Sequence, residues 1–185
     1  MLNSTELYES DQIDLWKRKK LIHLTWSDVT LAVDNIVNKV LIDDFQPHVI
    51  VGISRGGLVP TSLLSHRLGV RNLEIIGAEY YGNGYYPQRV SEKPIIGPIT
   101  FETQYHSALL VDDIAGSGMT ISEVGSRLTA KIRNIRTATL VKNERCPIRI
   151  DYVSRIVDDF VVFPWEAYDR KYNKPYVPKT WKREI

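Results

Sequence analysis

Residues 107–120 read SALLVDDIAGSGMT, and this stretch decides how the chain is organised. It begins with a short apolar run, typical of a buried β-strand, so we predict a strand over residues 107–112. The run ends in two adjacent carboxylates, Asp112 and Asp113, and a turn at 114–118 that contains two glycines. An amphipathic pattern follows and predicts a helix over residues 119–133. A strand, a glycine-rich turn and a helix are therefore expected in succession.

The same alternation recurs along the chain. Short β-branched runs at 48–53, 73–78 and 136–142 predict three more buried strands. Between them, apolar residues at helical spacing predict one helix that begins near Ser27, with Thr25 as its cap, and another over 57–68. Strands that alternate with helices favour an α/β fold, a mostly parallel sheet with helices on both faces. In such folds ligands bind at the carboxyl ends of the strands.

The composition narrows the class of protein. The 185 residues carry a formal net charge of +2, too nearly balanced to require nucleic acid as a partner. Cys146 is the only cysteine, so the chain forms no intrachain disulfide and no cysteine metal cluster. The polar, acidic start does not resemble a secretory signal, and no apolar run is long enough to span a bilayer. We expect a cytoplasmic protein with no membrane partner.

The turn after the 107–112 strand is suited to binding a phosphate. Its glycines let backbone amides approach an anion, the following helix adds a partial positive charge, and Ser117 and Thr120 can donate hydroxyl hydrogen bonds. Asp112 and Asp113 are acceptors when ionised, so they suit ribose hydroxyls or a magnesium ion better than the phosphate. The alternative is that the two aspartates merely cap the helix or face solvent.

The motif VDDIAGSGMT resembles the phosphoribosyl pyrophosphate signature of the type I phosphoribosyltransferase family. Three other blocks extend the resemblance over roughly residues 24–166: LTWSDV, VGISRGGLVPTSLLSHRLGVR and DYVSRIVDDFVVFPWE. Within the family, the chain is most similar to the bacterial xanthine-guanine, or 6-oxopurine, enzymes. The resemblance implies the family's α/β fold with a small hood, and transfer of ribose 5-phosphate to a purine with release of pyrophosphate.

The resemblance also implies a set of site residues. Asp112 and Asp113 would bind Mg²⁺ and, with Arg55, would be catalytic. Phosphoribosyl pyrophosphate would contact Ser54, Arg55, Gly56, Arg89, Asp112, Asp113, Ala115, Gly116, Ser117, Gly118, Met119 and Thr120.

The block Ser54–Arg55–Gly56–Gly57 corresponds to the family's pyrophosphate loop, where a cation and close amides would capture the leaving group. The family often has a non-proline cis peptide at this point, so we expect one between Ser54 and Arg55. The alternative is a plain strand-to-helix turn with a surface arginine. Arg89 lies in a long segment rich in glycine, proline and tyrosine, where the family has its mobile active-site loop.

Three residues are implied in base recognition. Lys142 matches a family lysine that donates to the purine O6, Phe160 matches an aromatic that stacks on the base, and the backbone of Val161 matches a group that contacts the purine edge. Each has a simpler interpretation, because a lysine at a strand end is commonly solvated and a phenylalanine in DDFVVFPW is commonly part of the core.

Gly116 departs from the family pattern. The 6-oxopurine enzymes typically have an aspartate at this position that handles the proton on purine N7, whereas adenine and orotate enzymes lack it. Loss of a general acid or base typically costs about 100- to 10,000-fold in rate. The departure leaves two hypotheses open: an enzyme with reduced or altered base preference, or a catalytically weak regulatory protein that senses phosphoribosyl pyrophosphate or a nucleotide.

The sequence divides into an N-terminal extension (1–24), a phosphoribosyltransferase domain with its hood (25–166) and a C-terminal tail (167–185). The basic run KRKK at 17–20 is typical of a solvated helix end rather than a nucleic-acid contact. By analogy with the family we expect a homo-oligomer, a dimer or tetramer.

Overall fold

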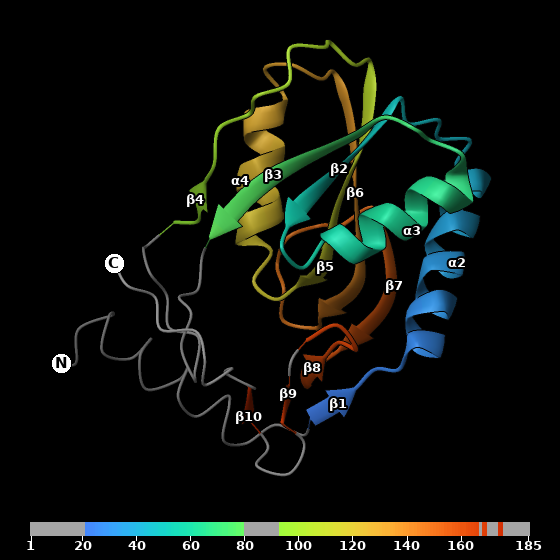
Figure 1. The fold of residues 1–185 in the computed structure, drawn as a ribbon, viewed down its shortest axis with the longest axis vertical. Helices are drawn as coiled ribbons and strands as arrows, with labels where there is room; N and C mark the ends of the chain where they lie inside the picture. The colour runs from blue at the N-terminus through green and yellow to red at the C-terminus, as the bar shows by residue number, and fades with distance from the viewer. Residues whose placement is uncertain (1–20, 80–92, 167, 170–173, 176–185) are drawn as a thin grey trace, which may run out of the picture. The chain divides into compact units, whose positions relative to one another are not determined.

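The elements of the chain alternate as the sequence predicts (Figure 1). The computed structural model describes residues 21–79, 93–166, 168–169 and 174–175. In chain order its elements are β1 (Leu21–His23), α2 (Trp26–Ile42), β2 (Val49–Ser54), α3 (Leu58–Leu68), β3 (Leu73–Glu79), β4 (Ile95–Ile96), β5 (Ser107–Ala115), α4 (Met119–Leu128), β6 (Asn134–Asn143), β7 (Tyr152–Val157), β8 (Phe160–Val162), β9 (Tyr168–Asp169) and β10 (Lys174–Pro175).

Six of these strands form one sheet with the order β4-β3-β2-β5-β6-β7. The five strands from β3 to β7 in that order are mutually parallel, and the short β4 pairs antiparallel with β3. β5 lies in the interior, between β2 and β6, and its first five residues are all buried. Such a strand needs apolar residues on both faces, which explains the continuous run ALLV. The mostly parallel α/β fold predicted from the sequence is confirmed.

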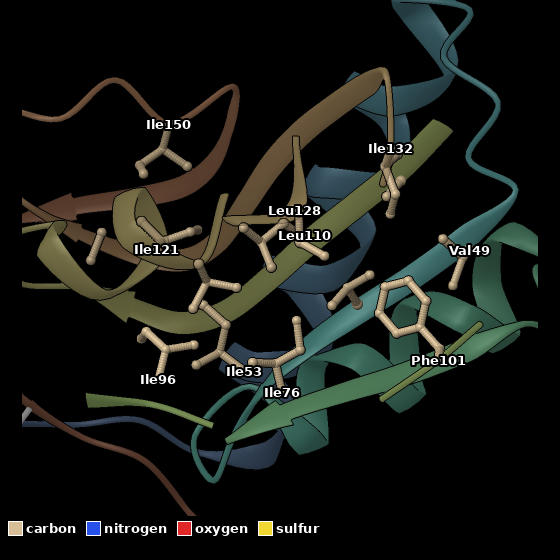
Figure 2. Packing of buried hydrophobic residues seen from close by; sticks show 14 of the residues in the cluster. Val49, Ile53, Ile76, Ile96, Phe101, Leu110, Ile121, Leu128, Ile132 and Ile150 are labelled. Carbon is tan, nitrogen blue, oxygen red and sulfur yellow. The ribbon is translucent and has the colours of Figure 1, made fainter. Parts of the chain in front are cut away.

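Helices cover both faces of the sheet. α4 lies on one face, and α2 and α3 lie on the other (Figure 1). The face under α4 holds a buried cluster to which β2 contributes alternate residues, Val49, Val51 and Ile53 (Figure 2). Alternate residues of a strand point to the same face, so the period of two in the sequence selects this set. The cluster is completed by Ile76, Ile96, Phe101, Ala108, Leu110, Ala115, Ile121, Val124, Leu128, Ile132, Cys146 and Ile150.

Two predicted boundaries were wrong by three residues or more. The strand expected over 107–112 continues to Ala115, because Ala115 still pairs with Lys142 of β6. Asp112 and Asp113 therefore belong to the strand, where backbone pairing fixes their orientation. The helix expected to reach residue 133 ends at Leu128, whose carbonyl accepts hydrogen bonds from the N–H groups of Lys131 and Ile132. This turn directs the chain into β6.

Contacts divide the chain into two units: Ser27–Val157, and Met1–Trp26 together with Asp158–Ile185. The first unit contains the six-stranded sheet. In the second, β1 pairs parallel with β8, and β9 pairs antiparallel with β10. The division into extension, domain and tail made from the sequence stays a prediction. In the part of the chain that the structure describes, no helix has the length and apolar content to cross a membrane.

A glycine pair tests how tightly the start of α4 is packed. Gly118 and Gly69 both have positive φ, +77° and +69°. A Cβ at Gly118 would lie 2.6 Å from Cβ of Ile148, whereas nothing lies within 4 Å of one at Gly69. Gly69→Ala should lower the free energy of unfolding by about 1–2 kcal/mol, the cost of a left-handed backbone in alanine. Gly118→Ala should lower it by the same amount and by about 1–3 kcal/mol more, because the added methyl group overpacks the site. Urea unfolding measures both, and equal losses would contradict this packing.

Candidate active site

The carboxyl ends of β2, β5 and β6 lie side by side at one edge of the sheet. Gly52 of β2 is in register with Val111 of β5, so Ser54 and Asp113, each two residues further along, reach the same level. On the other side of β5, Ala115 is in register with Lys142. Residues from three separate segments of the sequence are therefore brought to one edge by the parallel backbone pairing.

The turn after β2 has the predicted unusual backbone. The peptide bond between Ser54 and Arg55 is cis, which confirms that prediction. The turn is closed by hydrogen bonds from the N–H of Gly57 to the carbonyl of Ile53, at 2.8 Å, and from the N–H of Leu58 to the carbonyl of Arg55, at 3.1 Å. The Arg55 side chain is exposed. Its guanidinium can therefore meet an anionic ligand from solution.

Both glycines of this turn lie very close to neighbouring groups. A Cβ at Gly56 would lie 2.5 Å from Cγ of Asp113, so the Asp113 carboxylate is packed directly against the turn. A Cβ at Gly57 would lie 2.6 Å from the carbonyl oxygens of both Ile53 and Val111. Gly57 was not among the predicted site residues, although the doubled glycine in the sequence was a usable signal. It lets the turn approach β5.

Asp112 and Asp113 are held by their own backbone. The N–H of Asp113 donates to Oδ1 of Asp112 at 3.0 Å, and the N–H of Ile114 donates to Oδ1 of Asp113 at 2.7 Å. Asp113 is buried, with 9% of its surface exposed. The Asp113 carboxylate lies against the turn that leads into α3, and the side chains of the two aspartates also interact with each other.

The environment of Asp112 favours its protonated form. Desolvation raises the pKa of this carboxyl well above its usual range, and the charge of neighbouring Asp113 raises it further. A cation or a hydrogen-bond donor at the strand end would relieve both penalties. The pair is therefore prepared for a ligand that supplies positive charge or hydroxyl groups.

The loop between β5 and α4 has the features of an anion site. Gly118 adopts the left-handed conformation and precedes the helix, and Oγ of Ser117 accepts a hydrogen bond from the N–H of Met119 at 3.4 Å. The amino terminus of α4 carries a partial positive charge. Gly116 is exposed, and a Cβ there would meet nothing within 4 Å. This position thus has room for a side chain.

The remaining predicted residues fall into three groups. Lys142 is half-buried near the end of β6. Phe160 and Val161 lie on β8 in the second unit, where Phe163 stacks on Trp165 at 4.6 Å and Val161 is buried. Lys142 belongs to the first unit, and the base site predicted from these three residues stays a prediction. Arg89 and the basic run at 17–20 lie outside the described residues, as does most of the predicted tail.

The carboxylate pair is suited to a magnesium ion. Among the described residues, no group of three or more histidine, cysteine, aspartate or glutamate side chains could enclose a metal. Mg²⁺ does not need such a cage, because it retains water and is commonly bound by one or two carboxylates together with substrate phosphates. Asp112 and Asp113 fit that donor set.

Comparisons with known proteins match this arrangement. A family model described as the phosphoribosyl transferase domain matches residues 25–171. The xanthine-guanine phosphoribosyltransferase of Gluconobacter oxydans is 30% identical over 119 residues, which cover 64% of this chain and 68% of that protein. The protein of the same name from Cereibacter sphaeroides is 30% identical over 129 residues, which cover 69% and 73%.

A solved structure is similar over most of both chains. The purine phosphoribosyltransferase from Pyrococcus horikoshii has a TM-score of 0.68 and 30% sequence identity. The alignment covers 80% of this chain and 95% of that one.

The raised pKa of Asp112 makes a prediction about stability. Its ordinary value is 3.8, and the folded value is higher, so above pH 3.8 the folded state binds more protons than the unfolded state. The free energy of unfolding therefore falls as the pH rises from 3.8 to the higher pKa of the folded state. In chelator-containing buffer, Asp112→Asn should be more stable than wild type at neutral pH, and its advantage should grow from pH 4 upward.

The control is Asp34→Asn. Asp34 forms a surface ion pair with Arg67 at 3.4 Å and has a half-exposed side chain. Its replacement should give no gain at neutral pH. Urea unfolding from pH 4 to pH 8 measures both variants. An Asp112→Asn advantage that does not change with pH would contradict the assigned environment.

Proposed function

The chain belongs to the phosphoribosyltransferase family, and on that premise we propose that it transfers ribose 5-phosphate from phosphoribosyl pyrophosphate to a 6-oxopurine. Guanine, xanthine and hypoxanthine are the proposed bases, and pyrophosphate is the leaving group. The observation that carries the proposal is the end of β5, where Asp112 and Asp113 are followed at once by the glycine loop and the start of α4.

This strand end suits the two halves of one substrate. The ribose hydroxyls are donors and would bind the acceptor oxygens of Asp112 and Asp113. The 5-phosphate is an anion and would bind the backbone amides and hydroxyls of residues 115–120 at the helix terminus. Because the carboxylates immediately precede the loop, one short segment would hold the whole sugar phosphate.

The chemistry follows from where charge develops. The bond between ribose C1 and the pyrophosphate oxygen breaks, and a ring nitrogen of the purine bonds to C1 and releases its proton to water. Asp112 and Asp113 favour positive charge on the sugar, and exposed Arg55 would bind the departing pyrophosphate. A bound Mg²⁺ would neutralise negative charge on the leaving group.

Base selection is proposed for Lys142, Phe160 and Val161. Lys142 carries donors only, so it would favour a purine with a carbonyl at position 6 over adenine, which has an amino group there. Phe160 would stack on the purine, a contact worth about 1–3 kcal/mol. The names of the similar xanthine-guanine phosphoribosyltransferases support the same class of base.

A nucleotide-salvage role in the cytoplasm fits these features. The single cysteine, Cys146, is buried, which suits a reducing compartment. A homo-oligomer is proposed by analogy with the family.

A base panel tests the proposed function. The protein is incubated with Mg²⁺, phosphoribosyl pyrophosphate and each of guanine, xanthine, hypoxanthine, adenine and orotate, and nucleotide formation is followed by chromatography. At least one 6-oxopurine should be converted, and adenine and orotate should not. An Asp112→Asn/Asp113→Asn variant controls for contaminating activity. Conversion of none of the five bases would reject the enzyme and leave the second candidate, a regulatory protein that binds the same substrate.

Gly116 is the observation that favours the second candidate, and it can be tested directly. Its backbone is not in the left-handed region and its position is open, so an aspartate fits without strain. Gly116→Asp should raise kcat for 6-oxopurines, by up to about 100-fold if it restores general acid–base catalysis. Gly116→Asn is the control, because it has the same shape and cannot exchange the proton. Equal rates in the two variants would show that a missing acid is not the cause of slow turnover.

A further inference from the structure

Thr139 is a buried polar residue without an evident structural role. It lies within β6, its side chain is fully buried, and its hydroxyl has no hydrogen-bond partner in the described residues. Burial of a hydroxyl without a partner destabilises the fold. A valine has nearly the same shape and would avoid that cost. Something other than packing therefore has to account for the hydroxyl.

The register of the sheet places Thr139 beside the candidate site. Across the β5–β6 ladder Thr139 is paired with Asp112, and across the β6–β7 ladder it is paired with Val153. Paired residues on neighbouring strands point to the same face of a sheet, and the strands are about 4.8 Å apart. In this row of three side chains, Thr139 has a carboxylate on one side and a hydrocarbon on the other. The carboxylate is its polar neighbour.

A second hydrogen-bond donor would help to orient the Asp112 carboxylate. One of its oxygens, Oδ1, accepts the N–H of Asp113 at 3.0 Å. The side chain of Asp113 also interacts with Asp112, but an ionised carboxylate supplies no donor, so it does not fix the plane of the Asp112 carboxylate. A donor at the other oxygen, from the adjacent strand, would fix that plane.

We propose that Thr139 is a positioning residue for Asp112, with its hydroxyl donating to the Asp112 carboxylate when the ribose hydroxyls or the metal ion are bound there. The inference rests on the substrate-binding role proposed above for Asp112. Thr139 itself does not touch the substrate. It holds the carboxylate in the orientation that the sugar requires.

The chain contains a matched control. Thr61 on α3 is also buried, and its hydroxyl likewise has no partner in the described part of the chain. The Thr61 hydroxyl fills the space above Gly52, since a Cβ at Gly52 would lie 2.5 Å from it. Its neighbour is a glycine rather than a carboxylate. Thr61→Val therefore repeats the chemical change of Thr139→Val at a residue that is not paired with Asp112.

The test compares stability with affinity for phosphoribosyl pyrophosphate. Calorimetric titration in Mg²⁺ without a base gives Kd, and thermal unfolding gives Tm. Both valine variants should gain about 2–4 °C in Tm, because each removes an unpaired buried hydroxyl. Only Thr139→Val should weaken binding, by roughly tenfold for the loss of a hydrogen bond to a charged group. Thr139→Ser keeps the hydroxyl, so it should keep the wild-type Kd even though losing the methyl group lowers its Tm.

If the role of Thr139 were merely structural, changes in Kd would correlate with changes in Tm across these variants. The proposal predicts that Kd and Tm change independently. Equal Kd values for Thr139→Val and Thr61→Val would overturn the inference, and so would a loss of affinity in Thr139→Ser as large as in Thr139→Val. Asp112→Asn is the reference for the proposed function. If wild type fails to bind phosphoribosyl pyrophosphate, or if Asp112→Asn binds it normally, the proposed function is rejected. If Asp112→Asn binds weakly and Thr139→Val binds normally, only the inference about Thr139 is rejected.

Discussion

The parallel backbone pairing of β5 with β2 on one side and β6 on the other is the constraint on which the site depends. This pairing brings three features to one edge of the sheet: the turn with the cis peptide after Ser54, the carboxylates of Asp112 and Asp113, and Lys142. Apart from the two adjacent aspartates, these groups are far apart in the sequence. A slip of β5 by one residue would misalign Asp112 and Asp113 with the turn after β2 and with Lys142.

The buried faces of the sheet secure that register. The alternating residues of β2 and the apolar side of α4 pack into one cluster, which a slipped strand could not fill. At the carboxyl edge of the sheet, in contrast, the electrostatic interactions are unfavourable. Two carboxylates adjoin one another, Asp112 is held where its pKa is raised, and Asp113 is pressed against Gly56. Such a cost is expected at a functional site, because the ligand that relieves it binds there.

Prediction from the sequence succeeded where a local pattern was sufficient. The run ALLV gave a buried strand, and the spacing of Ile121, Val124 and Leu128 gave the buried face of α4. The prediction failed where residues distant in the sequence determine the structure. β5 reaches Ala115 because of its pairing with Lys142, and β1 forms only because β8 pairs with it from the other end of the chain. Thr139 gains its proposed role from a neighbour on another strand, which no spacing along the sequence reveals, whereas the doubled glycine at 56–57 is visible in the sequence.

The central claim is that the Asp112–Asp113 pair binds the hydroxyls of a ribose 5-phosphate. The most direct measurement is a cycle of four calorimetric titrations, in which wild type and Asp113→Asn each bind guanosine 5′-monophosphate and its 2′,3′-dideoxy analogue. If the carboxylate binds the hydroxyls, removing both partners should cost little more than removing one, with a coupling free energy of at least about 1 kcal/mol. Strictly additive losses would contradict the claim.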